Sequence, residues 1–246
     1  GDSITSNGIN NGGAGAVNWL MYACIASKGK LHWVDSVGGG GYKTARILDE
    51  LVPVVLALDP RPSYCAVLAG PNDTGVTSFA SWSADYASIL DALSEAGIMP
   101  IICPIIPSDT ASKHADAAKF NAWLNLQAKA RGIPYIDWLP DLMDPATGGS
   151  WLSGLEDDGV HPIAAGAKAM GDALWRELEP WLAGQPTWKP YLTTSNTDPT
   201  NLHTNGLFLT DSNTDGLADN LGVSEGGPDT FTDYVTPSLE DPVNGD

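Results

Sequence analysis

The sequence predicts an α/β protein: a three-layer α/β/α sandwich around a parallel, flavodoxin-like sheet over residues 1–183. Helical and extended patterns alternate along this part of the chain, as expected when helices connect parallel strands. Two of the extended segments, over residues 64–69 and 98–106, are apolar runs, which are typical of strands buried on both faces. Hydrophobic residues make up 43% of the chain, enough for an apolar core and too many for a disordered chain.

The expected elements follow from these patterns in chain order. Gly97 and Gly132 each follow a helical pattern, and glycine suits the left-handed conformation that ends many helices. Pro53 lies inside another helical pattern and is expected to kink it. The expected helices cover residues 14–27, 43–58, 79–96, 111–131 and 163–183, and the expected strands cover residues 31–34, 64–69, 98–106 and 133–138.

Four polar or glycine-rich blocks lie at the ends of the expected strands or just before the last helix. They read GDSI at residues 1–4, SVGGGG at residues 36–41, GPND at residues 70–73 and DGVH at residues 158–161. Ligands of parallel sheets bind at the carboxyl ends of the strands, where such loops meet. By the same reasoning the first strand of the sheet should precede Gly1, so a piece of chain that begins at Gly1 is expected to be less stable.

The first and last blocks contain the three groups that nucleophilic acyl chemistry needs. Ser3 requires a base, because a serine hydroxyl is inert at neutral pH. His161 can be that base, since the unperturbed pKa of histidine is ~6.5. Asp158 can fix the tautomer of the imidazole and stabilise the imidazolium ion. Any one block alone is better explained as a turn or a capping loop, but all four in order favour a catalytic site.

In this order and spacing, the four blocks resemble those of the SGNH (GDSL-type) hydrolases, which are named for the Ser, Gly, Asn and His that the blocks contribute. The resemblance covers residues 1–183. It implies that Ser3 is the nucleophile, His161 the general base and Asp158 the carboxylate that orients the base. Asp157 is an alternative acid, but the D-x-x-H spacing favours Asp158.

The resemblance also implies an oxyanion hole. Its donors would be the backbone N–H groups of Ser3 and Gly41 and the side chain of Asn72. Glycine lets backbone approach a ligand closely, and asparagine donates an N–H without adding charge. Four consecutive glycines leave Gly40 as an alternative to Gly41, and Ser36 stands where the family commonly has asparagine.

Three residues near the blocks have other expected roles. Asp2 and Asp73 are expected to hydrogen-bond the backbone of their loops. Trp151 has two interpretations that the sequence leaves open: it belongs to the apolar core, or it binds substrate by lining the cleft.

The function implied by the resemblance is that of a serine esterase that needs no cofactor for catalysis. The expected substrates are acyl esters, O-acetyl esters above all, of a small molecule or polysaccharide. The alternatives are a lipase, aryl-esterase or thioesterase of the same fold, or a carbohydrate-binding tail adhesin without activity. A net charge of −18 argues against nucleic acid as a partner, and no apolar run approaches the roughly 18 residues of a membrane span.

Residues 184–246 differ in composition and are expected to form a linker and the start of an acidic module. Ten of the 30 acidic residues lie in residues 183–246, together with a single base, Lys189. From residue 211 to residue 219, acid and amide side chains alternate as in a calcium loop. Gly222 stands at the position where such a loop has its last acidic ligand. An Asx-rich turn is the alternative interpretation. Such a modular chain suits an extracellular, secreted or phage-tail protein. The expected ligands of a structural calcium ion are Asp211, Asn213, Asp215 and Asp219.

Overall fold

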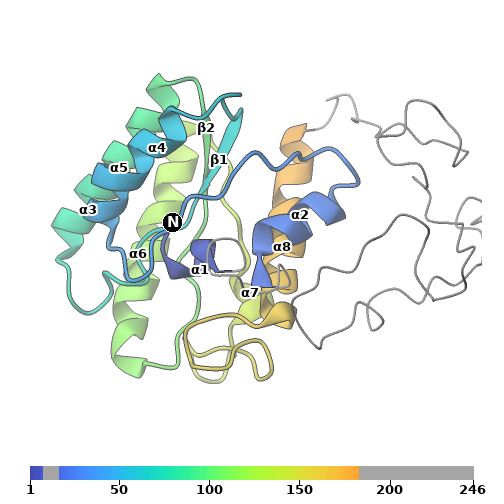
Figure 1. Cartoon of the computed structure of the whole chain (residues 1–246). Helices are drawn as coiled ribbons and strands as arrows, with labels where there is room; N and C mark the ends of the chain where they lie inside the picture. The colour runs from blue at the N-terminus through green and yellow to red at the C-terminus, as the bar shows by residue number, and fades with distance from the viewer. Residues whose placement is uncertain (8–16, 183–246) are drawn as a thin grey trace, which may run out of the picture. The chain divides into compact units, whose positions relative to one another are not determined.

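The computed structural model describes residues 1–7 and 17–182. In this part of the chain, helices cover both faces of a short sheet of parallel strands (Figure 1). The predicted α/β class is therefore confirmed. The strands are β1 (Tyr64–Val67) and β2 (Met99–Ile102); the helices are α1 (Ser3–Ser6), α2 (Trp19–Ala26), α3 (Thr44–Arg46), the π-helical turn η2 (Ile47–Leu51), α4 (Val52–Leu56), α5 (Phe79–Glu95), the 3₁₀ turn η3 (Ala111–Lys113), α6 (His114–Arg131), α7 (Leu139–Leu142), α8 (Ala164–Leu178) and the 3₁₀ turn η4 (Glu179–Leu182).

Two of the four expected strands form the sheet. β1 and β2 lie inside the expected strands over 64–69 and 98–106, and they pair in parallel along their whole length. The strand expected over 133–138 is reduced to one parallel bridge between Ile102 and Tyr135. Pro134 precedes that bridge, and proline has no N–H to donate to a longer ladder.

The prediction of a strand over residues 31–34 was wrong, because these residues form coil. A strand requires a neighbour that takes its ladder hydrogen bonds. Here the N–H of Leu31 donates instead to the hydroxyl of Ser27 at 2.9 Å, and the hydroxyl of Ser36 donates to the carbonyl oxygen of Thr5 at 3.2 Å. The segment is thus tied to the end of α2 and to α1, and not to the sheet.

Side chains of the sheet alternate between two apolar clusters, one on each face. Ile101 and Cys103 pack in a cluster with residues of α2, α7 and α8. Val67 and Ile102 pack in the other cluster, with residues of α5 and α6. Because successive side chains of a strand point to opposite faces, burial on both faces explains why the strand sequences are apolar throughout.

The helices lie close to their expected positions. The pattern over 43–58 forms α3, η2 and α4 in succession, and the π turn comes directly before the first turn of α4, which contains Pro53. A π turn is one way for a helix to accommodate a change in its hydrogen-bond ladder. Gly97 and Gly132 follow α5 and α6 with φ angles of 75° and 63°, in the left-handed conformation that was expected of them.

Candidate active site

Ser3, His161 and Asp158 form a continuous chain of hydrogen bonds. The Ser3 Oγ lies 2.8 Å from the His161 Nε2, and the His161 Nδ1 lies 2.7 Å from the Asp158 Oδ2. The carboxylate can only accept, so Nδ1 carries a proton and the neutral ring presents Nε2 as an acceptor to the serine hydroxyl. The side chains of His161 and Asp158 are 31% and 50% exposed, so a substrate can reach the group from solvent.

Ser3 is placed by the start of α1. Asp2 is the N-cap of this helix, and its Oδ1 accepts from the N–H of Ile4 at 3.0 Å. The backbone of Asp2 is extended, with φ −97° and ψ −150°, so the chain turns sharply into the helix at the nucleophile. A capping aspartate satisfies one of the N–H groups that the first turn leaves without a partner.

Asp158 holds His161 in place through its backbone and its ring. Its Oδ1 accepts from the N–H of Val160 at 2.9 Å and from that of His161 at 2.7 Å, while its Oδ2 binds the ring. Gly159 allows this tight turn, since its φ angle of 77° is in the left-handed region. The hydrogen bonds with the His161 side chain and backbone lower the pKa of Asp158 to about 2, so its carboxylate is charged at neutral pH.

Asn72 connects the first three blocks. Its Nδ2 donates to the carbonyl oxygen of Tyr42 at 3.1 Å and contacts the Asp2 Oδ2 at 3.4 Å. Tyr42 directly follows the glycine run, and Asp2 directly precedes Ser3. The side chain expected in the oxyanion hole is therefore fixed between the loop of glycines and the loop of the nucleophile.

The glycine loop packs on the backbone of the first block. A Cβ atom at Gly38 would lie 2.6 Å from the Ser6 nitrogen and 2.7 Å from the Asp2 carbonyl oxygen, so only glycine fits there. The N–H of Gly39 donates to the carbonyl oxygen of Gly1 at 3.1 Å. These contacts bring Gly38 and Gly39 against the backbone on either side of the nucleophile.

Of the two glycines considered for the oxyanion hole, Gly41 has a φ angle of 73°, in the region that favours glycine. A Cβ built at Gly40 or at Gly41 would have no atom within 4 Å. The backbone at both positions is thus open to an incoming group, and the donor role of Gly41 stays a prediction.

Two buried aspartates support the site, and one of them does more than the sequence predicted. Asp73 accepts from the N–H and the hydroxyl of Thr44 at 2.9 and 2.8 Å, which ties the loop of Asn72 to the start of α3. Asp2 contacts the side chain of Asn72 in addition to capping α1. Burial raises the pKa of Asp2 to about 6, against the opposing effect of the Ile4 hydrogen bond. The sequence signal for these roles was a carboxylate directly beside each predicted functional residue.

Trp151 does not line the site. Its side chain is 4% exposed and belongs to the apolar cluster beneath α8, so the interpretation as a substrate-binding residue was wrong and the core interpretation holds. The indole ring is large and apolar, and burial against other apolar side chains stabilises it strongly.

The predicted calcium ligands Asp211, Asn213, Asp215 and Asp219 lie outside the described residues, and calcium binding stays a prediction. Within residues 1–7 and 17–182, no group of three or more His, Cys, Asp or Glu side chains is arranged to hold a metal ion. No helix in the same part of the chain has the length and apolar character to cross a membrane.

Comparison with known proteins identifies the family to which the chain belongs. The model of the GDSL-like lipase/acylhydrolase family matches residues 1–169, whereas the comparison with curated proteins found no match.

Several solved structures share the fold. One, described as a lipolytic protein of the G-D-S-L family from Desulfitobacterium hafniense, has a TM-score of 0.61 and 21% identity, over 72% of this chain and 95% of the other. A GDSL-like lipase from Bacteroides thetaiotaomicron has a TM-score of 0.52 and 22% identity, over 59% and 75%. A catalytic mutant of an acetylxylan esterase from Geobacillus stearothermophilus has a TM-score of 0.57 and 15% identity, over 72% and 90%. With a family match over most of its length, this chain belongs to the GDSL-like lipase/acylhydrolase family of ester hydrolases.

Proposed function

We propose that the chain is a serine esterase that removes short acyl groups, O-acetyl groups above all, from a carbohydrate or another small alcohol. The hydrogen-bond chain from Ser3 through His161 to Asp158 is the observation that carries this proposal. It has the order nucleophile, base and orienting carboxylate, at distances that allow direct proton transfer.

The reaction has two halves. In the first, the Ser3 Oγ attacks the ester carbonyl carbon while the His161 Nε2 takes the hydroxyl proton. The tetrahedral intermediate collapses as His161 returns that proton to the leaving alcohol, which leaves an acyl group on Ser3. In the second half, His161 takes a proton from water, whose oxygen attacks the acyl carbon, and the carboxylic acid departs as Ser3 recovers its proton. Asp158 stays ionised throughout and stabilises the imidazolium form of His161.

The oxyanion of both intermediates needs preorganised donors. We assign this role to the backbone N–H groups of Ser3 and Gly41 and to the side chain of Asn72. The Nδ2 of Asn72 makes one close contact, to the Tyr42 carbonyl, and one long contact of 3.4 Å to Asp2. Donation to an oxyanion would replace one of these two contacts, and the longer one, to Asp2, is the weaker.

Replacing Asn72 with alanine should lower kcat by about 10²–10³, the effect of removing one oxyanion donor. KM should change little, because the donor acts mainly in the transition state. Steady-state kinetics with p-nitrophenyl acetate measures both constants. Asn125→Ala on α6 is the matched control and should keep the wild-type kcat. A kcat for Asn72→Ala within threefold of wild type, with the fold intact by circular dichroism, would contradict the assignment.

Replacing Asp158 with asparagine should lower kcat by about 10³–10⁴, since the ring of His161 loses its orienting charge and its tautomer is no longer fixed. Asp157→Asn, one residue away, should leave kcat unchanged. If the two variants behave in the opposite way, Asp157 is the acid of the site.

Asp158 should also affect stability at low pH. Its pKa in the folded chain is about 2, below its ordinary value of 3.8. Its contribution is therefore fully present above the ordinary value and is lost as the pH falls toward 2. As the pH is lowered from 5 to 2, the Tm of Asp158→Asn should fall by less than the Tm of wild type. An equal fall in Tm for the two proteins would contradict this assignment.

The preference for short acyl groups is supported by the space near the site. A cavity of about 210 Å³ is lined by Pro71 and Val160, the neighbours of Asn72 and His161, and otherwise largely by apolar side chains such as Ile106. Ser3, Asn72 and His161 are not among its lining residues, so its support for the proposal is that it lies next to the loops of Asn72 and His161, while the exposed side of the triad leaves room for a bulky alcohol. One of the structures with this fold is an acetylxylan esterase, which is consistent with an acetylated polysaccharide as substrate.

A panel of esters tests this proposal. p-Nitrophenyl acetate should be hydrolysed with a kcat/KM at least ~10-fold above that of the octanoate, and acetylated xylan should release acetate. A kcat/KM that rises with acyl length would instead identify a lipase, and a preference for acyl thioesters a thioesterase. Binding of acetylated xylan without turnover of any ester would identify the carbohydrate-binding tail adhesin.

A further inference from the structure

A run of four glycines, residues 38–41, carries the predicted backbone donor of the oxyanion hole. Glycine loses more conformational freedom than any other residue when it becomes ordered. Oxyanion donors, in contrast, are effective only when they are fixed before the reaction begins. Because glycines have no side chains to hold them, the run depends on anchors before and after it.

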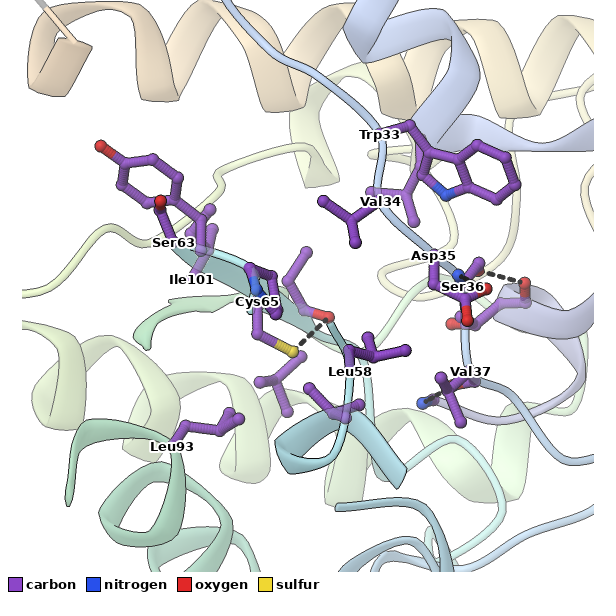
Figure 2. Close-up of a pocket in the computed structure, with 18 of the residues that line it drawn as sticks. Trp33, Val34, Asp35, Ser36, Val37, Leu58, Ser63, Cys65, Leu93 and Ile101 are labelled. Carbon is purple, nitrogen blue, oxygen red and sulfur yellow. Dashed lines mark hydrogen bonds between the residues drawn. The ribbon is translucent and has the colours of Figure 1, made fainter. Parts of the chain in front are cut away.

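The anchor before the run is the coil of residues 35–37. Figure 2 shows Asp35, Ser36 and Val37 on this coil, which borders a cavity of about 360 Å³ beside β1. Ser36 is buried, and its hydroxyl donates to the carbonyl oxygen of Thr5 at 3.2 Å. This hydrogen bond ties the chain just before the run to α1, the helix that begins at the nucleophile.

The anchor after the run is the backbone of Tyr42. Its N–H donates to the carbonyl oxygen of Gly39 at 3.1 Å, which closes a turn over residues 39–42. Gly41, the third residue of this turn, has a φ angle of 73°, as in a type II turn, where this position requires a positive φ. The carbonyl oxygen of Tyr42 accepts from the Nδ2 of Asn72 at 3.1 Å. One residue thus contacts both the glycine turn and the amide of Asn72.

The ring of Tyr42 packs on the turn that its backbone closes. A Cβ atom at Gly39 would lie 2.6 Å from each of three ring carbons, so the ring lies against this glycine and no larger residue fits there. The guanidinium carbon of Arg46 lies 3.8 Å from the ring centroid, close enough for a cation–π contact. With Gly39 and Arg46 both packed against it, the ring offers little surface for stacking on a sugar.

Arg46 and Glu50 hold the ring from the neighbouring helical segment, formed by α3 and η2. The hydroxyl of Tyr42 donates to the Oε2 of Glu50 at 2.9 Å, and the Nε of Arg46 donates to the Oε1 of the same carboxylate at 2.8 Å. The three side chains therefore form a closed cycle of contacts. Hydrogen bonds from Arg46 and Tyr42 also lower the pKa of Glu50, so this carboxylate is charged at neutral pH and accepts from both.

We propose that Tyr42 is a positioning residue of the oxyanion hole, whose ring fixes the turn of the glycine run and whose carbonyl oxygen fixes the amide of Asn72. Arg46 and Glu50 keep the ring in place. This role rests on the proposed esterase function and explains how the donors of that site are held. Tyr42 acts through Gly41 and Asn72 and not on the substrate itself, so its loss should weaken transition-state stabilisation and leave binding of the ester unchanged.

Replacing Tyr42 with alanine should lower kcat for p-nitrophenyl acetate by about 10-fold to 10²-fold, since a small displacement of catalytic groups costs this much. KM should change by less than about threefold. Tyr42→Phe keeps the ring contacts with Gly39 and Arg46 and should retain a kcat within about threefold of wild type. The double variant of Tyr42→Ala and Asn72→Ala should lose less than the product of the two single losses, because both substitutions disturb the same donor.

Arg46→Ala keeps the test decisive if Tyr42→Ala does not fold, because it leaves the backbone and the ring of Tyr42 intact. It should lower kcat by about three- to tenfold. The matched control is Lys168→Ala on α8, which should leave kcat unchanged. Lys168 forms an ion pair with Asp172 that has the same i,i+4 spacing as the pair of Arg46 and Glu50 and a similar exposure.

Hydrogen–deuterium exchange gives a readout that needs no turnover. Exchange at the backbone amide of Gly39 should be ~10-fold faster or more in Tyr42→Ala and unchanged in Tyr42→Phe. Wild-type exchange in Tyr42→Ala, a wild-type kcat in both Tyr42→Ala and Arg46→Ala, or a loss that multiplies fully with that of Asn72→Ala would overturn the proposal. A wild-type chain that hydrolyses no ester, with exchange that responds as expected, would contradict the proposed function and still support the anchoring of the loop by Tyr42.

Discussion

Replacing Ser3 with alanine is expected to lower kcat for p-nitrophenyl acetate by about 10⁵–10⁶. Without the Ser3 Oγ no acyl-enzyme can form at this residue, and His161 loses the hydroxyl that it activates. The residual rate would come from the oxyanion donors and from binding alone. Initial rates at saturating ester, with the protein concentration raised for the variant, measure the loss.

The matched control is Ser83→Ala. Ser83 is a half-buried serine on α5 whose hydroxyl donates to the carbonyl oxygen of Ala80, and its loss should leave kcat unchanged. A Ser3→Ala protein that folds normally and retains more than a tenth of the wild-type kcat would rule out Ser3 as the nucleophile.

Replacing His161 with glutamine is expected to lower kcat by a similar factor, about 10⁵–10⁶. Glutamine can still hydrogen-bond to the Ser3 Oγ, but it cannot accept the proton at neutral pH, so the nucleophile is no longer activated. His32→Gln, at an exposed histidine beside the 360 Å³ cavity, should keep the wild-type kcat.

Residues that act as one unit are not additive when they are removed together. The double variant of Ser3→Ala and His161→Gln should therefore be no slower than either single variant. Losses that multiply would show that the two residues act independently, in conflict with the 2.8 Å contact between them.

The parts of the fold that could be predicted from the sequence are those set by local patterns. The apolar runs of β1 and β2 are buried on both faces, so their sequences identify them without further information. Gly97 and Gly132 end their helices through a conformation that few other residues adopt. In contrast, residues 31–34 have the composition of a strand but form coil, because a strand depends on its neighbour as well as on its own residues.

The candidate site, too, could be predicted from the sequence only in part. Ser3 and His161 are 158 positions apart in the sequence. Their contact could be predicted because both were expected in loops at the carboxyl end of a parallel sheet. The contact of Asn72 with Asp2 could not be predicted, since it depends on how two loops lie against each other. The burial of Trp151 likewise could not be predicted, because an aromatic residue near a site in the sequence can pack in the core or line the cleft.

The most direct test of the nucleophile is covalent labelling. Diethyl p-nitrophenyl phosphate loses p-nitrophenolate when an activated serine attacks its phosphorus, which leaves a stable diethylphosphoryl group on that serine. Peptide mass spectrometry of the labelled full chain should place this group on Ser3 and nowhere else, and His161→Gln should abolish the label. A label on a different serine, or an active protein that stays unlabelled at Ser3 when its hydrolysis of p-nitrophenyl acetate is blocked, would contradict the proposed mechanism.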